Sequence, residues 1–513
     1  MLIFISLVWS GTISLRADRY VVEPGTPGGT DTGEFNDWGI AATQIQWAVD
    51  KAAGGETVWV SNGVYVLTNQ ISVTKGIVLR STNGMNYTFV NGGYASGGPY
   101  TNRCFYIAHS DAVLDGFTIT NGNAGTGGFG GGVYMTDGTV QNCLIAMNFA
   151  ADGFGAGVYQ YPKGTLRYCT ISNHNGATYG GGVCAQGGFV QHCTIVSNQG
   201  RLGAGMNLYI ATSEYCTITG NACAGSWGGG AGIYLSQNSG ARSCAVVNNS
   251  SPNANFPGGG CYFAGPDNSV QDCLISGNGG PTDGGGIYIH PNAEISFLRN
   301  CTINSNTSVS GGGISSAGDN LNTIENCVIS YNNASSGGGG VNLGWGRKGP
   351  MLLRNCLISS NVASVSGGGV WVGDGNTGIL QNCTIVSNTT GGKGGGLFGT
   401  NANCRATNCI VYFNQAAGDG NNYTNDLGIL SLTYSCATPL PAGTGNSANN
   451  PLFVNAGNGN YRLRQDSPCI NAGLNESWMT NAFDLDGRAR IRYGTVDMGA
   501  YETIQDGSLY GFH

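Results

Sequence analysis

Short groups of apolar residues recur along most of the chain, separated by polar and glycine-rich segments. In each group a cysteine is followed two positions later by Ile or Val and five positions later by Asn; Cys143, Ile145 and Asn148 are the first such set. One repeat departs from this pattern and has His174 at the Asn position. An earlier, less regular copy lies over residues 117–122. The repeated cysteines, 23 to 29 residues apart, are Cys143, Cys169, Cys193, Cys216, Cys244, Cys273, Cys301, Cys327, Cys356, Cys383 and Cys409.

The spacing of two between the Cys and the Ile places both side chains on the same side of a β-strand. Because both are apolar, this side is predicted to face an interior. The Asn that follows tolerates turn conformations, and its amide can donate to and accept from the equivalent amide of the next repeat. Stacked repeats would therefore contain a buried Asn ladder, and each new strand would satisfy the free edge of the one before it.

A glycine cluster and a second strand lie between each Asn and the next Cys. Residues 130–132 and 180–182 are all glycine, and Gly-Ala-Gly takes their place at 155–157 and 203–205. Glycine permits positive φ and a close approach of two backbones, which a sharp corner requires. An apolar–aromatic–apolar triplet such as Val133-Tyr134-Met135 often follows the cluster, which is typical of a strand with one outward and two inward side chains.

A repeat of about 26 residues with several short strands corresponds to one turn of a β-helix. A propeller blade, the alternative, needs about 40 residues and four longer strands. We therefore predict a right-handed parallel β-helix, a solenoid that grows by adding turns. The expected organisation is a signal peptide at 1–17, an N-terminal cap at 18–56, the β-helix at 57–435 and an irregular C-terminal cap at 436–513. Within 41–53, Ile45 and Val49 have helical spacing and Gly54 follows as a stop, which predicts a short capping helix.

Composition narrows the functional classes. The chain has 513 residues, of which 90 are Gly and 10% are charged, and its formal net charge is −7. It has no run of Lys and Arg, which argues against nucleic acid as a partner. The first residues are apolar and lead to small residues before Asp18, as in a signal peptide. No later apolar run approaches 18 residues, so we expect no transmembrane helix.

The 18 cysteines would suggest disulfides in an exported protein. The repeated ones, however, would stack with parallel side chains, a geometry that disfavours a bond between neighbours. We therefore expect buried free thiols that act as small apolar groups. Cys436 and Cys469 lie outside this series, and a disulfide between them stays open as an alternative. No pair of Cys-x-x-Cys motifs predicts a zinc site.

Three segments resemble known families. Residues 48–65, with Ala-Val-Asp-Lys-Ala-Ala-Gly-Gly-Glu-Thr-Val-Trp-Val and then Gly-Val-Tyr, resemble the opening of pectate-lyase-like β-helix proteins. The alternation of Gly-Gly-Gly-(Val/Ile)-Tyr with Ile-x-x-Asn resembles the repeats of bacterial polymorphic outer-membrane proteins, which are adhesins, although those carry Phe-x-x-Asn. The tail, with Ser-Pro-Cys-Ile-Asn-Ala-Gly at 467–473 and Val-Asp-Met-Gly-Ala-Tyr-Glu at 496–502, is similar to that of choice-of-anchor Q bacterial surface proteins. These resemblances imply a β-helix that is secreted or placed at the cell surface.

One outward position follows each glycine corner and is aromatic in seven of eleven repeats. Stacked turns about 4.8 Å apart would align these rings in a stripe, and flat rings with a polar edge suit the C–H faces of sugars. In pectate-lyase-like proteins, by resemblance, this outer face carries the substrate. The alternative is that the rings only stabilise neighbouring turns. The predicted glycan-stacking residues are Tyr134, Tyr159, Tyr234, Tyr262, Tyr288, Trp371 and Phe398.

Catalysis on the same face would need carboxylates grouped with a cation. β-Helix lyases, by resemblance, hold Ca²⁺ with acidic residues and use Arg or Lys as the base, while β-helix hydrolases use clustered Asp. Asp283, His290 and Lys393 are scattered along the stripe. The best candidate group comes from adjacent turns and contains one carboxylate and two cations, namely Arg347, Lys348 and Asp374.

The sequence therefore predicts a secreted or cell-surface β-helix protein that is non-catalytic, adhesin-like or polysaccharide-binding, with a polysaccharide or cell-surface glycan as its partner. The alternative is a polysaccharide lyase or glycoside hydrolase acting on an extracellular acidic polysaccharide. We expect no cofactor, except Ca²⁺ if the protein is a lyase. Asp484-Leu-Asp-Gly487 begins like a Ca²⁺ loop but lacks the later ligands, which predicts a tight turn capped by its own carboxylate. A purely structural spacer or coat component is the third interpretation.

Overall fold

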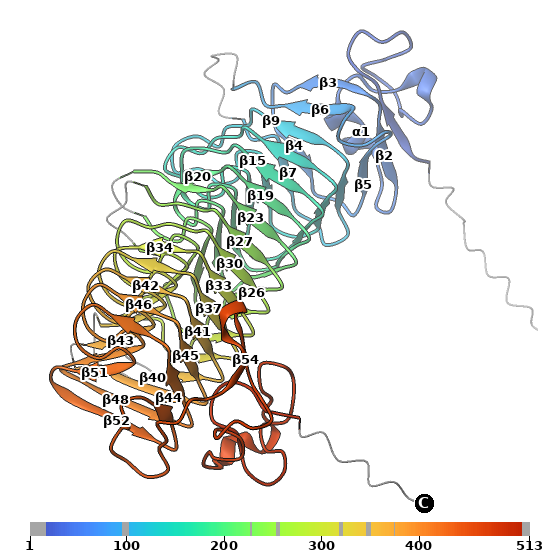
Figure 1. The fold of residues 1–513 in the computed structure, drawn as a ribbon. Coiled ribbons are helices and arrows are strands. Elements are labelled where there is room, and N and C mark those ends of the chain that lie inside the picture. Colours follow the sequence, from blue (N-terminus) through green and yellow to red (C-terminus); the bar gives the residue numbers. More distant parts are fainter. Residues whose placement is uncertain are drawn as a thin grey trace, which may run out of the picture.

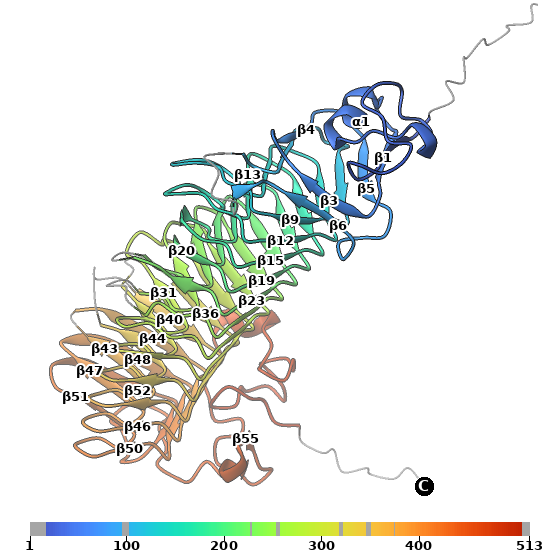
Figure 2. The ribbon, with the colours of Figure 1, turned by 90° about the horizontal axis from the view of Figure 1, so that it is seen from above.

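The protein winds into a right-handed parallel β-helix of about 14 turns, as predicted (Figures 1 and 2). The computed structural model describes residues 17–94, 102–225, 228–252, 257–317, 322–344, 350–373 and 375–504. Within these residues three long parallel sheets form the sides of the solenoid, and we call them sheets A, B and C. One turn passes from sheet C to sheet A, then to sheet B, and returns to sheet C through a glycine corner.

The bounds of the strands are given by sheet. Sheet A contains β1 (Arg19–Val21), β2 (Thr57–Val60), β5 (Val78–Ser81), β8 (Val113–Asp115), β11 (Thr139–Gln141), β14 (Thr165–Arg167), β18 (Phe189–Gln191), β22 (Thr212–Glu214), β26 (Gly240–Arg242), β29 (Ser269–Gln271), β32 (Phe297–Arg299), β36 (Asn322–Glu325), β40 (Pro350–Arg354), β44 (Thr377–Gln381), β48 (Ala402–Thr407) and β52 (Gly428–Thr433). Sheet B contains β3 (Gly63–Val66), β6 (Thr88–Asn91), β9 (Thr118–Thr120), β12 (Leu144–Ala146), β15 (Thr170–Ser172), β19 (Thr194–Val196), β23 (Thr217–Thr219), β27 (Ala245–Val247), β30 (Leu274–Ser276), β33 (Thr302–Asn304), β37 (Val328–Ser330), β41 (Leu357–Ser359), β45 (Thr384–Val386), β49 (Ile410–Tyr412) and β53 (Cys436–Ala437).

Sheet C contains β4 (Ile71–Val73), β7 (Phe105–Ile107), β10 (Val133–Met135), β13 (Val158–Gln160), β17 (Val183–Gln186), β21 (Met206–Tyr209), β25 (Ile233–Ser236), β28 (Cys261–Phe263), β31 (Ile287–Ile289), β35 (Ile314–Ser316), β39 (Val341–Leu343), β43 (Val370–Gly373), β47 (Leu397–Thr400) and β51 (Tyr423–Asn425). Short strands pair between sheets B and C in two groups: β16 (Ala177–Tyr179), β20 (Gln199–Leu202) and β24 (Ala222–Cys223), then β34 (Thr307–Ser308), β38 (Asn333–Ala334), β42 (Val362–Ala363), β46 (Thr389–Thr390) and β50 (Gln415–Ala416).

The repeated Cys and Ile point into the core, as their spacing predicts. Cys143 and Ile145 are fully buried, and Ile145 pairs in register with Ile171 of the next turn. Sheet A contributes the same kind of contact, because Val140 pairs with Leu166 in register. A single apolar core therefore runs along the axis of the solenoid, built from one or two inward side chains per strand.

The predicted Asn ladder is present and buried. The Nδ2 of Asn221 donates to the Oδ1 of Asn249 in the next turn (3.0 Å) and to the Ile195 carbonyl in the previous turn (3.0 Å). The Oδ1 of Asn221 in turn accepts from the backbone N–H of Asn198 (2.9 Å). The ladder amides are thus satisfied by their neighbouring turns, which gives the solenoid a polar spine beside its apolar core.

The residues with a left-handed backbone conformation are not the ones that the repeat suggested. The ladder asparagines were expected to supply the turn conformation, but positive φ occurs one residue earlier, as at Met147 (φ 53°) and Ser197 (φ 56°). A second left-handed column stands between sheets A and B and includes Asn142, Tyr168 and His192. The residue before the ladder Asn therefore makes the bend, and the Asn side chain is left to bond along the stack.

The cysteines are free and buried throughout the described residues, as expected for the ladder. The thiol of Cys273, for example, donates to the Gln271 carbonyl at 3.0 Å. Cys436 and Cys469, for which a disulfide was left open, are also free thiols, and both pack in one cluster with Phe453 and Tyr461.

The N-terminal end of the solenoid is covered by a short helix, α1 (Ile45–Lys51), which lies within the predicted helical segment 41–53. Its buried residues Ile45, Ala48 and Val49 join the core, and the 3-10 helix η1 (Trp38–Ile40) precedes it. The predicted signal peptide falls almost entirely outside the described residues, which begin at 17. Among the described helices, none has the length and apolar character required to cross a membrane.

The C-terminal segment does not extend the solenoid along its axis. It folds back over the outer face of sheet B, beside the last turns (Figures 1 and 2). Its antiparallel hairpin, β54 (Phe453–Asn455) and β55 (Asn460–Leu463), is followed by the 3-10 helix η4 (Ser477–Asn481); η3 (Ala456–Asn458) lies in the hairpin loop. Its apolar residues form a cluster with Leu357, Val386 and Ile410 of sheet B. We call residues 451–504 the tail.

Candidate functional site

The outward residues of sheet C stand in one register, which we call the sheet C column. Tyr134 pairs with Tyr106 on one side and with Tyr159 on the other, and Trp371 pairs with Phe398. The seven predicted aromatic residues therefore do lie on a common face, as the repeat indicates. Seen from the N-terminal end, the column contains Ser72, Tyr106, Tyr134, Tyr159, Cys184, Asn207, Tyr234, Tyr262, Tyr288, Ser315, Asn342, Trp371, Phe398 and Thr424.

The column is divided into three aromatic groups by small and polar residues. Cys184 and Asn207 separate the first group from the second, and both are almost fully buried. Ser315 and Asn342 separate the second group from the third. The continuous stripe that the repeat suggested is therefore interrupted, and each group has its own surroundings.

The first group is a cluster of rings from three adjacent turns and their corners. Tyr134 and Tyr159 lie 5.2 Å apart between ring centroids, and Phe129 lies 4.7 Å from Tyr159. Phe129 and Tyr161 expose 37% and 49% of their surface. We call this group the aromatic platform; its members are Tyr106, Phe129, Tyr134, Phe154, Tyr159, Tyr161 and Tyr179.

Arg103 adds a positive charge to the aromatic platform. Its guanidinium carbon lies 5.2 Å from the Tyr134 ring centroid, and its Nη1 donates to the Oε1 of Gln70 (3.3 Å). Burial lowers the pKa of this guanidinium from its usual value, while Tyr134 and Tyr106 act in the opposite direction. Arg103 makes no ion pair within the described part of the chain, and its Nε is buried without a hydrogen-bond partner there. Among the described residues, the platform thus carries a cation without an ion-pair partner.

The second group contains Tyr234, Tyr262 and Tyr288. The rings of Tyr234 and Tyr262 are stacked, with centroids 5.0 Å apart and planes 15° from parallel, and Tyr288 lies 5.2 Å further on. Tyr262 is only 8% exposed, because glycines 229 and 230 of the preceding turn leave room for its ring to lie down over the backbone. Burial raises the pKa of Tyr234 and Tyr288 to about 12.

Asp283 and His290 flank this second group. The Asp283 charge contributes to the raised pKa of Tyr288, and the His290 ring lies 6.5 Å from that of Tyr288. Burial raises the pKa of Asp283 and lowers that of His290. The Nδ1 of His290 accepts from the backbone N–H of Asn292 (3.2 Å), so the neutral ring carries its proton on Nε2. This arrangement leaves no free lone pair on His290 for a general base.

The third group is the pair Trp371 and Phe398. A Cβ on Gly337 would lie 2.8 Å from the Trp371 ring, so this indole rests directly on glycine backbone. Phe398 is 4% exposed, and Tyr159 of the first group is 5% exposed. Phe398, Tyr159 and Tyr262 therefore fit the alternative in which outward rings only stabilise neighbouring turns, because little of their ring surface is left for a ligand.

The best predicted catalytic group, Arg347, Lys348 and Asp374, lies outside the described residues. Lys393 is described and forms an ion pair with Asp426 (2.7 Å). The corner column connects Lys393 to Ser366 and Gly337, and Asp283 to Ser310, so Asp283 and Lys393 are separated by several turns, as expected from the sequence. They do not share a site.

The Asp484 turn has the structure predicted for it. Asp484 Oδ1 accepts from the backbone N–H groups of Asp486 (2.9 Å) and Arg488 (2.7 Å), and its Oδ2 accepts from the N–H of Glu502 (2.7 Å). The carboxylate is thus committed to backbone donors. Asp484 therefore has a structural role in the C-terminal tail.

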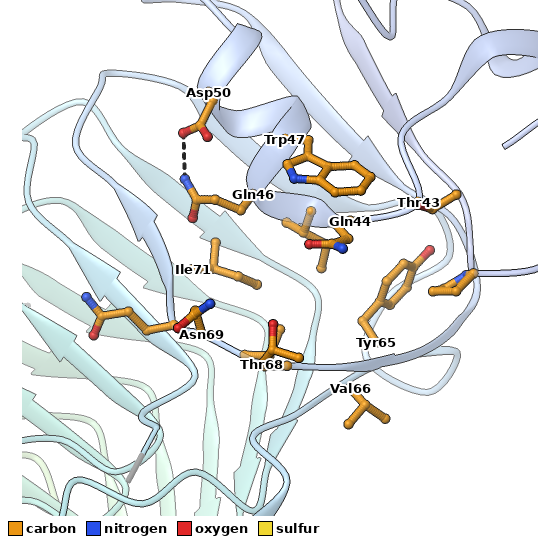
Figure 3. A pocket seen from close by; sticks show the side chains of 14 residues that line it. Thr43, Gln44, Gln46, Trp47, Asp50, Tyr65, Val66, Thr68, Asn69 and Ile71 are labelled. Carbon is orange, nitrogen blue, oxygen red and sulfur yellow. Dashed lines mark hydrogen bonds between the residues drawn. The ribbon is translucent and has the colours of Figure 1, made fainter. Parts of the chain in front are cut away.

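A hollow of about 310 Å³ lies next to the N-terminal end of the sheet C column (Figure 3). Its walls are α1 on one side and the segment from Tyr65 to Ile71 on the other. Trp47, Gln44 and Gln46 line it from the helix, and Thr68 and Asn69 face them (Figure 3).

Sequence reasoning missed Arg103, Phe129, Tyr161 and this hollow. A signal for Phe129 was present, since an aromatic residue precedes the glycine corner in three successive turns, at 129, 154 and 179. Tyr106 shows the same apolar–Tyr–apolar triplet as Tyr134 but lies before the regular Cys series. Arg103 and the hollow have no repeated signal, because they arise where the first turns meet the cap.

The match to a family profile agrees with this architecture. The family profile described as the right handed beta helix region matches residues 189–348 and 285–425. No curated protein sequence matches the chain. Among solved structures, a pectate lyase is 13% identical over 95% of this chain and 97% of its own, with a TM-score of 0.29. The A-module of a mannuronan C-5 epimerase from Azotobacter vinelandii is 14% identical over 62% of this chain and 90% of its own, with a TM-score of 0.37.

A third similar structure is the catalytic unit of an α-1,3-glucanase from Streptomyces thermodiastaticus, which is 13% identical over 72% of this chain and 69% of its own, with a TM-score of 0.31. Similarity at this level says nothing about ligand or reaction, because one fold carries many functions. The profile match and the three parallel sheets together establish what the chain is: a right-handed parallel β-helix.

Proposed function

We propose that the protein is a non-catalytic, adhesin-like β-helix protein, secreted or displayed at the cell surface, that binds a polysaccharide on the outer face of sheet C. The aromatic platform is the observation that carries this proposal. Phe129 and Tyr161 offer exposed ring surface, while Tyr134 and Tyr159 support it from the sheet. Rigid rings held by stacked strands pair with the C–H faces of sugars at little conformational cost.

A polymer suits this face better than a small ligand. Tyr106 and Tyr288 stand seven turns apart in the sheet C column, a distance of roughly 34 Å at the strand spacing of a sheet. Arg103 supports a polymer that carries carboxylates, since its cation has no ion-pair partner in the described chain. Such a contact is weakened by salt, because the guanidinium stays partly accessible to solvent.

The binding test uses affinity electrophoresis and calorimetry with a panel of acidic and neutral polysaccharides. We expect Tyr161→Ala to weaken binding about tenfold, equivalent to about 1.4 kcal/mol. Arg103→Gln is expected to remove most of the salt dependence. Tyr331→Ala is the matched control, because Tyr331 is 65% exposed at the corner that follows sheet B. Equal effects of Tyr161→Ala and Tyr331→Ala would contradict the platform as the binding surface.

The proposed location has its own test. The full chain is expressed in a Gram-negative host, and its N-terminus is determined in each cell fraction. We expect the mature chain to begin near Asp18 and to be found outside the cytoplasm. An unprocessed chain that stays in the cytoplasm would count against secretion and surface display, but not against polysaccharide binding.

Asp283 is the observation that favours the enzymatic alternative, because it is a desolvated carboxylate beside Tyr288 on the proposed binding face. A lyase or hydrolase would release unsaturated or reducing ends from an acidic polysaccharide. We expect no product with or without Ca²⁺. Product formation that is lost in Asp283→Asn or in Asp374→Ala would replace the non-catalytic proposal with the enzymatic one.

A further inference from the structure

The hollow beside α1 is the continuation of the sheet C column at its N-terminal end. Ser72 is the first residue of that column and pairs in register with Tyr106. The Gln46 side chain binds both backbone groups of Ser72: its Oε1 accepts from the N–H (2.7 Å), and its Nε2 lies 3.3 Å from the carbonyl. Gln46 therefore replaces the strand of a preceding turn and ends the sheet.

Gln70 joins the hollow to the aromatic platform. Its Nε2 donates to the Oγ of Ser72 (3.2 Å), while its Oε1 accepts from Arg103, whose guanidinium lies over Tyr134. The surface that runs along the column thus passes over Gln70 and enters the hollow. A polymer lying on the platform would reach the hollow with one of its ends, because α1 closes the solenoid immediately behind it.

The hollow offers one aromatic ring and several uncharged hydrogen-bonding groups. Trp47 also lines a second hollow, of about 340 Å³, between α1 and residues 31–35, so protein does not fill the space around its ring. The side-chain amides of Gln44 and Asn69 are exposed and have no hydrogen-bond partner in the described chain. An indole face with free amides around it is suited to a pyranose ring and its hydroxyl groups.

The charges of the hollow distinguish it from the platform. Asp50 is the charged residue among those that line it, and its Oδ1 already accepts from Gln46 (2.7 Å). No Lys, Arg or His is among the described residues that line the hollow, so a carboxylate on the ligand would find no cation among them. Its volume lies near the lower limit for small-molecule sites, which fits one sugar unit.

We propose that this hollow is a subsite for the terminal, uncharged pyranose unit of a heteropolysaccharide whose following units lie on the aromatic platform. Trp47 stacks on the sugar ring, and Gln44, Thr68 and Asn69 bind its hydroxyl groups. This inference rests on the proposed polysaccharide binding. It adds that the hollow holds one end of the polymer, so that the bound polymer has a fixed direction along sheet C. Capping alone does not account for the site, since Gln46 and the apolar face of α1 already close the solenoid.

The first experiment detects the sugar unit directly in the full chain. The probes are the methyl glycosides of glucose, galactose, mannose, xylose, rhamnose and N-acetylglucosamine, with the methyl glycoside of galacturonic acid as the charged counterpart. We expect at least one neutral glycoside to change the tryptophan emission with a dissociation constant on the order of 1 mM. Trp47→Phe is expected to remove this change, and Trp38→Phe to keep it, because Trp38 is exposed on η1 and outside the hollow.

The second experiment measures polymer binding with variants on both surfaces. We expect Trp47→Ala and the double variant Gln44→Ala/Asn69→Ala each to weaken polymer binding about tenfold, with folding checked by circular dichroism. The double variant keeps the inference testable if the loss of Trp47 disturbs the cap, because Gln44 and Asn69 are exposed. Enzymatic removal of the terminal sugar from the polymer should reproduce the loss.

The outcomes separate this inference from the proposed function. Polymer binding that depends on Tyr161 but not on Trp47, together with no response to any neutral glycoside, would overturn the end subsite and leave the platform standing. A response to the charged glycoside equal to that of the neutral ones would also overturn it. Absence of polymer binding together with a Trp47-dependent response to a neutral glycoside would refute the proposed function and the end subsite with it, and would leave the hollow as a site for a free neutral sugar.

Discussion

His174 makes two of the hydrogen bonds of a ladder asparagine with different groups. In His174 the Nδ1 accepts from the backbone N–H of Asn148 (3.0 Å), and the Nε2 donates to the Ile145 carbonyl (2.9 Å). The equivalent atoms of a ladder Asn are its Oδ1 and Nδ2, as at Asn221. A neutral imidazole therefore fits the ladder because it presents one acceptor and one donor in the required directions. Only the neutral form fits, which makes this single residue sensitive to pH.

We expect His174 to make the stability of the protein fall as the pH is lowered. Burial lowers the pKa of His174 to about 4, whereas an unfolded histidine has a pKa near 6.5. Between these values the unfolded chain binds a proton that the folded chain does not, so stability is lost from about pH 6.5 down to about pH 4 and not further. The difference corresponds to about 3 kcal/mol.

Urea unfolding at pH 7 and pH 4.5 measures this loss. His174→Asn should restore the regular ladder and reduce the difference between the two pH values by most of that amount. His192→Asn is the control, because His192 is an exposed histidine in the left-handed column. An identical pH dependence in His174→Asn and the unchanged chain would refute the assignment to His174.

A ladder Asn in the middle of the solenoid should tolerate His better than Ala. Asn278 is fully buried and exchanges bonds with Asn306, with Val246 and with the N–H of Asn249. Asn278→Ala leaves several buried groups without partners and should lower the free energy of unfolding by about 3 kcal/mol. Asn278→His should cost about 1 kcal/mol at neutral pH. Chemical denaturation gives both values, and a larger loss for His than for Ala would contradict the shared bonding pattern.

At the scale of elements, the tail and sheet B form the contact that the repeat does not encode. The side chains of Asn355, Asn382 and Asn408, which stand in the left-handed column between sheets A and B, donate to the carbonyls of Phe483, Asp497 and Leu474. Inside the tail, Arg490 is fully buried and pairs with Glu502 at 3.1 Å. The tail is thus a small folded element that covers sheet B laterally, with a buried ion pair at its centre.

Arg490→Met should release the tail from sheet B while the solenoid stays folded. The substitution removes the cation that pairs with Glu502 and that also faces the buried Asp497, which we expect to destabilise the tail by about 3 kcal/mol. Limited proteolysis with mass analysis should show cleavage near residue 438 and a resistant solenoid fragment. The control is Arg462→Met, because the pair of Arg462 with Asp486 is partly exposed and worth at most about 1 kcal/mol. A cooperative loss of the whole fold in Arg490→Met would show instead that tail and solenoid unfold as one unit.

The whole molecule is a stack in which each turn contacts mainly its two neighbours. Every strand of sheets A, B and C pairs with the strands of the adjacent turns in parallel register, and the core residues repeat along the axis. Stability in such a solenoid is approximately a sum over turns and the interfaces between them. The aromatic platform and the end hollow both depend on the first turns, whereas the tail covers the last ones.

Removal of one complete turn should leave the fold intact. Deletion of residues 273–300 joins Asp272 to Cys301, which occupy consecutive positions of the repeat, and removes one strand from each long sheet. The shortened chain should fold and keep the oligomeric state of the unchanged chain, as seen by circular dichroism and light scattering. Deletion of residues 273–286 alone should abolish folding, since sheet B would lose a strand while sheets A and C kept theirs. If both deletions behave alike, the turns are not independent units.

The sequence by itself determined the solenoid. Ile145 pairs with Ile171 of the next turn, and Asn148 bonds to His174 at the same ladder position there, so a pattern that repeats locally is enough to specify inward strands, the ladder and the outward column. The same reasoning identified the register of Tyr134, Tyr159 and Trp371. It could not say which rings are exposed. Tyr159 packs against Phe129 and Phe154 of the corners and is 5% exposed, while Phe398 is 4% exposed, and no repeat describes this packing.

Only the tertiary structure decided where the special sites lie. The hollow forms because α1 meets the first strand of sheet C, and Arg103 reaches Tyr134 from the preceding turn. The tail meets sheet B across more than one hundred residues of sequence, as in the bond from Asn355 to Phe483. A repeat constrains each turn through its nearest neighbours and says nothing about contacts between segments that occur once. The fold was therefore readable from periodicity, while the surfaces that carry the proposed function required the packing of unique segments at the two ends.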